Sequence, residues 1–133
     1  MGAALFIVPE REIAGFDTFV NGKSLGGIDA EVLDKYCEAI GVTPLYSFCS
    51  IDPEDLAEML EDAGEDVPDD LPDLQWFDAS TGLTSVRALL GKLRAGEAPF
   101  ANVEKIIEDL EEFERVLERL ENERLRWYLS VDC

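Results

Sequence analysis

The chain has 133 residues, 47% of them hydrophobic, which suffices for one domain with its own core and is too short for two. Thirty acidic residues against eleven basic ones give a formal net charge of −19 at pH 7. This charge argues against binding nucleic acid through its phosphates and against binding an anionic membrane surface, because both require clustered lysine and arginine. Histidine does not occur, which excludes the catalytic and metal-binding roles that depend on it.

Three widely spaced cysteines, Cys37, Cys49 and Cys133, are typical of a reducing compartment. Their odd number and the lack of a closely spaced pair argue against a disulfide framework and a zinc site, so we expect unreactive thiols. The first residues lack the basic and long apolar segments of a signal peptide, and no apolar run approaches the ~18 residues of a membrane span. These features predict a cytoplasmic location.

Two short segments near the chain ends have the character of β-strands. Residues 3–8 form an apolar run, which predicts a strand buried on both faces. Residues 125–131 alternate apolar and polar side chains, which predicts a strand with one buried face. We expect these two strands to pair. The dipeptide Asn21-Gly22 favours a tight turn and suggests a small hairpin around it.

Between these strands, apolar residues at helical spacing and capping residues predict helices. Asp29 and Asp52 are suitable N-caps for the first two helices, and Gly41 and Gly64 end them. An extended or irregular link is expected around Pro44. The four predicted helices span residues 29–40, 53–63, 80–94 and 103–124. The apolar stripe expected for the first helix consists of Val32, Leu33, Tyr36 and Ile40. The predicted fold is therefore a single, mostly helical α+β domain over residues 1–133, with about four helices packed on a small sheet formed by the N- and C-terminal strands.

The fourth helix, for which Asn102 is the expected cap, is the longest and the most regular. Its apolar residues recur in alternating steps of three and four, which predicts one buried face. Beside this face, Arg87 and Arg94 of the third helix are expected to meet acids of the fourth, in pairs worth only ~0.2–1 kcal/mol each. The expected acidic partners are Glu114, Glu118 and Glu121, and the apolar residues are Val103, Ile106, Leu110, Phe113, Leu117 and Leu120.

The acidic side chains concentrate between Asp52 and Asp73, a stretch with eleven carboxylates and no basic residue. It includes a loop at about residues 64–75 whose composition alone favours disorder. The carboxylates lack the alternate spacing, turn glycine and closing glutamate of a calcium loop, so we predict no specific metal site.

Two further features have some character of a nucleotide-binding or catalytic site. Residues 21–24 read NGKS and resemble the end of a phosphate-binding loop, but the position five residues before Gly22 is Asp17 where that motif needs glycine. Asp17 is also the best sequence candidate for a partly buried acid, although a turn-stabilising role fits it better. We therefore predict no catalytic residue and no cofactor.

Three interpretations of function stay open. The first is a non-catalytic acidic module that binds a basic protein partner, of the inhibitor, antitoxin-like or nucleic-acid-mimic type. The second is a small enzyme or ligand-binding protein that uses carboxylates in a buried pocket, and the third is acidity as an adaptation to high salt alone. We favour the first, because histidine, a glycine-rich motif and a reactive cysteine context are all lacking. The candidate partner-binding residues are Glu65, Asp66, Asp69, Asp70, Asp73, Trp76, Glu104, Glu108 and Glu112. The oligomeric state is open, with a dimer through the helix at 103–124 as one alternative.

Overall fold

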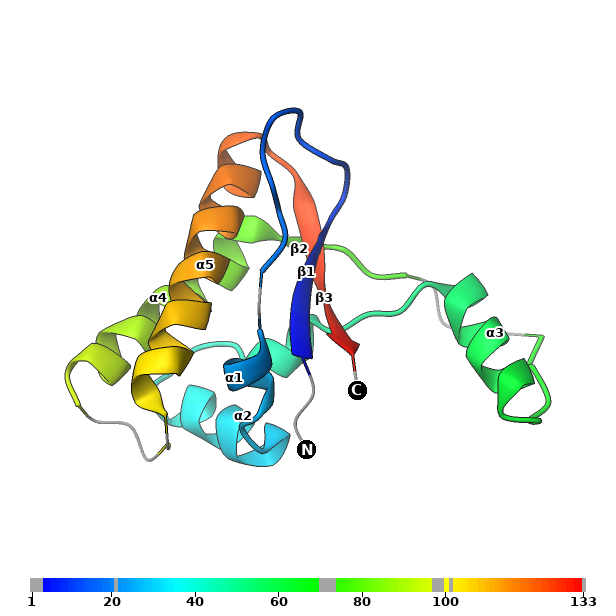
Figure 1. Cartoon of the computed structure of the whole chain (residues 1–133), viewed down its shortest axis with the longest axis horizontal. Helices are drawn as coiled ribbons and strands as arrows, with labels where there is room; N and C mark the ends of the chain where they lie inside the picture. Colours follow the sequence, from blue (N-terminus) through cyan, green and yellow to red (C-terminus); the bar gives the residue numbers. More distant parts are fainter. Residues whose placement is uncertain (1–3, 21, 70–73, 97–99, 101, 133) are drawn as a thin grey trace.

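Five α-helices and a three-stranded antiparallel sheet make up the computed structural model over the residues that it describes, which are 4–20, 22–69, 74–96, 100 and 102–132 (Figure 1). The strands are β1 (Ala4–Pro9), β2 (Phe77–Asp78) and β3 (Arg126–Asp132), in the order β1-β3-β2. The helices are α1 (Lys23–Gly26), α2 (Ala30–Ala39), α3 (Pro53–Asp62), α4 (Ala79–Arg94) and α5 (Val103–Asn122), with a 3-10 turn η1 (Leu45–Phe48).

The two terminal strands pair side by side, which confirms the predicted sheet. Ile7 of β1 lies opposite Leu129 of β3 in an antiparallel register. The prediction that β1 is buried on both faces is wrong, because only Leu5 and Ile7 are buried while the intervening Phe6 is half-buried. On the outer face of β1, the Phe6 ring lies 5.9 Å from the ring of Phe19 in the loop that follows the strand.

The third strand, β2, was not predicted. It is only two residues long and pairs Phe77 with Trp127 of β3. The Trp127 ring is fully buried beneath α4, and its Nε1–H donates to the backbone carbonyl of Asp78 at 3.2 Å. A two-residue strand leaves no periodic signal in the sequence, so only its partner could reveal it.

Helices α4 and α5 lie against each other and against one face of the sheet (Figure 1), and together they supply half of the buried apolar residues. Their buried side chains follow the predicted stripes, as the fully buried Val86, Leu110, Phe113 and Leu117 show. Such a two-layer arrangement leaves the opposite faces of both helices in solvent. The apolar stripe of α5 is thus buried against other elements of the same chain.

Side-chain caps account for the first residues of α2 and α3. Asp29 Oδ1 accepts from the backbone N–H groups of Glu31 and Val32, at 3.0 and 3.2 Å, and Asp52 Oδ1 accepts from Glu54 N–H at 2.8 Å. Asn102 is the N-cap residue of α5, as predicted, but it adopts a left-handed conformation with φ of 56° and its side chain makes no capping bond.

Three smaller expectations also differ from the structure. Gly22 forms an isolated bridge with Leu5 in place of the expected hairpin, and Asn21 lies outside the described residues. The link around Pro44 is the turn η1, which buries Leu45 and Phe48. Val32, expected on the apolar stripe of α2, is 46% exposed.

Two glycines of α4 provide a test of this packing. A Cβ at Gly82 would lie 2.5 Å from Cζ2 of Trp127, whereas a Cβ at Gly91 meets nothing within 4 Å. We expect Gly91→Ala to stabilise the protein by ~0.5–1 kcal/mol, because alanine is the better helix former. We expect Gly82→Ala to destabilise it by ~1–3 kcal/mol through overpacking. Urea unfolding of both variants measures the difference, and equal stabilities would contradict the contact between α4 and Trp127.

Candidate functional site

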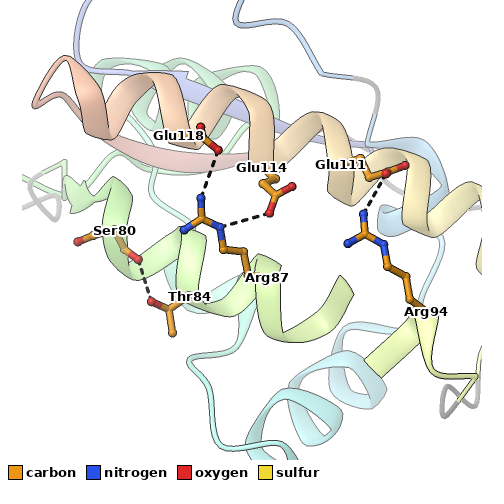
Figure 2. Close-up of polar contacts among 7 residues, drawn as sticks. All are labelled: Ser80, Thr84, Arg87, Arg94, Glu111, Glu114 and Glu118. Atoms are coloured by element: carbon orange, nitrogen blue, oxygen red, sulfur yellow. Dashed lines mark hydrogen bonds and ion pairs between the residues drawn. The ribbon is translucent and has the colours of Figure 1, made fainter. Parts of the chain in front are cut away.

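The seam between α4 and α5 carries the ion pairs that the sequence predicted, with one change of partner (Figure 2). Arg87 Nε lies 3.2 Å from Glu114 Oε2, and its Nη2 lies 3.2 Å from Glu118 Oε2. Arg94 Nη2 pairs instead with Oε2 of Glu111, at 2.9 Å. These side chains are all partly exposed, so each pair is worth at most ~1 kcal/mol and serves to orient the helices. The arginines of α4 are thereby paired with acids of α5 in the same chain.

Other arginines hold the loop between β1 and α1. The guanidinium carbons of Arg115 and Arg119 lie 5.2 and 5.3 Å from the centroid of the Phe16 ring, within the range of cation–π interaction. Arg126 Nη2 lies 2.7 Å from Oε2 of Glu10, and this hydrogen bond lowers the pKa of the Glu10 carboxyl. Much of the basic charge is therefore engaged in internal contacts.

The acidic block forms an arm that projects from the body of the protein (Figure 1). We define the acidic arm as residues 51–74, of which 70–73 lie outside the described residues. Its helix, α3, has no buried residue. At the base of the arm, Ser50 N–H donates to the Leu129 carbonyl at 3.3 Å, and Ser50 Oγ accepts from Gln75 N–H at 2.9 Å. The two legs of the arm are thus tied to each other and to β3.

The candidate partner-binding residues fall on separate surfaces. Helix α5 and the acidic arm lie on opposite sides of the molecule (Figure 1), so the structure does not join their carboxylates into one site. Trp76 is half-buried at the base of the arm, with its ring 5.2 Å from that of Tyr128. Asp70 and Asp73 lie outside the described residues. The exposed candidates are Glu65, Asp66 and Asp69 in the arm, and Glu104, Glu108 and Glu112 on α5.

One buried acid was missed by the sequence analysis. Asp17, the candidate chosen there, is exposed and accepts from Phe19 N–H at 2.9 Å, as a turn-stabilising aspartate does. Asp109 is only 8% exposed, and its Oδ2 accepts from Leu25 N–H at 3.0 Å. Burial raises the pKa of Asp109. Asp109 lies three residues after Ile106 and four before Phe113, which places it on the apolar face of α5. This spacing is the feature of the sequence that indicates its burial.

The described thiols are poor nucleophiles. Burial raises the pKa of the Cys49 thiol to about 11 and also raises that of Cys37, and the carboxylate of Asp34 adds to both effects. Asp34 Oδ1 is buried without a hydrogen-bond partner among the described residues, and burial raises its pKa as well. Because a thiolate is the reactive form, the raised pKa values lower the reactivity of Cys37 and Cys49 at neutral pH.

An open groove of about 490 Å³ lies between α1, α2 and the start of α5. Its walls are mixed: they include the side chains of Lys23, Lys105 and Ser24 beside those of Val32 and Phe100. The buried Asp109 does not line this groove within the described part of the chain, since its carboxylate binds the backbone of α1 instead. Among the described residues, no buried carboxylate lines the groove.

Comparison with protein-family models, with curated proteins and with solved structures finds no match. Over the described residues, no group of three cysteine, aspartate or glutamate side chains is arranged to hold a metal ion. The helices of that same part of the chain include none with the length and apolar character needed to cross a membrane. The interpretation of the site thus rests on its geometry and charge.

The raised pKa of Asp109 predicts a pH dependence of stability. Folding disfavours the ionised form, so the free energy of unfolding should fall as pH rises from the ordinary carboxyl pKa to the raised one. Asp109→Asn keeps an oxygen acceptor for Leu25 N–H but cannot ionise. We expect the difference between variant and wild type to move in favour of the variant through this pH range. Urea unfolding at a series of pH values tests this, and parallel curves would contradict it.

The exposed carboxylates predict a salt dependence of the melting temperature. Raising sodium chloride shortens the Debye length from ~10 Å at 0.1 M to ~3 Å at 1 M, which weakens repulsion between the acids, so the melting temperature should rise. Calcium chloride at equal ionic strength should add little. A large additional shift with calcium, abolished by Asp66→Asn with Asp69→Asn, would reveal a specific metal site in the arm.

Proposed function

We propose that this protein is a non-catalytic acidic interaction module that binds a basic protein partner. The observation that carries the proposal is the acidic arm, an element held out from the body whose sequence from Asp52 to Asp73 contains no basic residue. Among the described residues, the carboxylates of the arm take part in no ion pair. Their charge is therefore left for a partner.

The distribution of charge favours this function over acidity as an adaptation to salt. Salt adaptation calls for acids spread over the surface, whereas here the arm carries only acids and α5 carries acids interleaved with bases. A concentrated field of one sign accelerates encounter with a partner of the opposite sign and rejects partners of the same sign. Such a field suits recognition of a basic protein.

The decisive experiment is capture from a lysate of the native cells at low and at moderate salt. Three baits are compared: the wild type, an arm variant in which Glu58, Glu61 and Asp62 become Gln, Gln and Asn, and an α5 variant with Glu104, Glu108 and Glu112 changed to Gln. All six residues are exposed, so both variants should fold. An unrelated acidic protein of similar net charge serves as the control for non-specific attraction.

We expect a basic protein to be retained by the wild type at low salt and released at moderate salt. The arm variant should retain several-fold less of it, and the α5 variant should behave like the wild type. Equal retention by the wild type and by the unrelated acidic control, or no basic protein at all, would refute the proposed function.

A further inference from the structure

Helix α3 is two-faced and its apolar face lacks a cover within the described part of the chain. At ~100° per residue, Leu56, Met59 and Leu60 fall on one side of the helix and all five acids fall on the other. Leu56 and Leu60 are only half-buried, and Met59 is 59% exposed. In α4 and α5 the corresponding apolar residues are buried. An amphipathic stripe left this open is typical of a helix that packs against something else.

The charges at the two ends of α3 indicate the charge of a partner that would cover its apolar face. Its first turn is stabilised by the Asp52 cap, by Pro53 and by acidic side chains that complement the helix dipole. Its last turn carries Glu61 and Asp62 and no basic residue, so the negative end of the dipole is met by more negative charge. A cation placed there from outside would relieve both the dipole and the carboxylates.

The same charges exclude two other occupants. A second copy of the chain would bring its own five acids of α3 against these, within molecules that each carry a net charge of −19. An anionic lipid surface would be repelled in the same way. A basic protein surface with an apolar groove satisfies both the stripe and its acidic border.

We propose that α3 is a docking helix, which inserts Leu56, Met59 and Leu60 into an apolar groove whose rim supplies lysine or arginine. This inference rests on the proposed function and specifies the part of the protein that makes the contact. Helix-in-groove recognition reads apolar anchors at spacings of three and four, as found here. The anchored base of the arm, at Ser50 and Gln75, holds the two legs of the arm together before binding, which reduces the ordering cost.

Helical geometry also separates the acids by role. Asp55 and Asp62 border the apolar stripe on the side of Met59, whereas Glu58 and Glu61 point away from it. The bordering pair should meet the basic rim of the groove, and the distal pair should contribute only long-range attraction. Both pairs are exposed and both remove two negative charges when neutralised, so they form a matched comparison.

The test uses two synthetic peptides of identical lysine and leucine composition. In one, the leucines form a single stripe at helical spacing; in the other, the same residues are scrambled. Isothermal titration calorimetry measures binding to the full chain at low salt. The variants are Met59→Asp, the bordering pair Asp55→Asn with Asp62→Asn, and the distal pair Glu58→Gln with Glu61→Gln. Thermal melts confirm folding, and Met59→Gln replaces Met59→Asp if that variant unfolds.

We expect the wild type to bind the striped peptide about tenfold more tightly than the scrambled one, and Met59→Asp to abolish this preference. The bordering pair should weaken binding of the striped peptide several-fold more than the distal pair. Equal binding of both peptides by the wild type would overturn the docking helix while leaving the proposed function standing. Failure of both peptides to bind would overturn both. Self-association of the wild type that Met59→Asp removes, measured by sedimentation, would identify a second copy as the occupant and overturn the proposal.

Discussion

The fold depends on the burial of one large side chain, Trp127, near the start of β3. Its ring is fully buried and lies 5.0 Å from that of Phe48 in η1. Its Nε1–H is satisfied by the carbonyl of Asp78, at the end of β2 where α4 begins. Gly82 of α4 is the residue that lets the helix approach the ring. A single indole thus fixes the positions of η1, β2 and α4 around the sheet, because a buried ring of this size tolerates neither a gap nor an extra methyl group.

The base of the arm is attached to this same strand. Ser50 and Trp76, which flank the arm, contact Leu129 and Tyr128, the residues that follow Trp127. The arm can therefore carry an unfavourable concentration of acids without disturbing the core, since its own side chains contribute little burial. Strand β3 and the helices beside it supply stability, and the arm presents charge.

The regular features of the sequence predicted the fold, and the contacts that cross between distant segments were missed. Alternation at the C-terminal strand and the Asp29 and Asp52 caps are local signals, and all three hold in the structure. Strand β2 and the buried Asp109 depend on partners far along the chain, namely Trp127 and Leu25. Arg94 pairs with Glu111, which was not among its expected partners. The pairing depends on the angle at which α4 and α5 cross, and a helical wheel drawn for each helix alone does not give that angle. For the candidate site, composition located the acidic arm, but only the structure separated it from the acids of α5.

Helix α3 is short enough for its stability to bear on its function. Isolated helices of its ten residues are marginal in water, and in most proteins a buried face supplies the missing stability. Here that contribution is lacking in the described part of the chain, and the cap of Asp52 and the glycine at position 64 replace only part of it. Covering the stripe would add the burial that α3 lacks, while a cation near Asp62 would reduce the electrostatic cost of its last turn. Binding and helix stability are then linked, because a partner that favours the folded helix stabilises it by mass action.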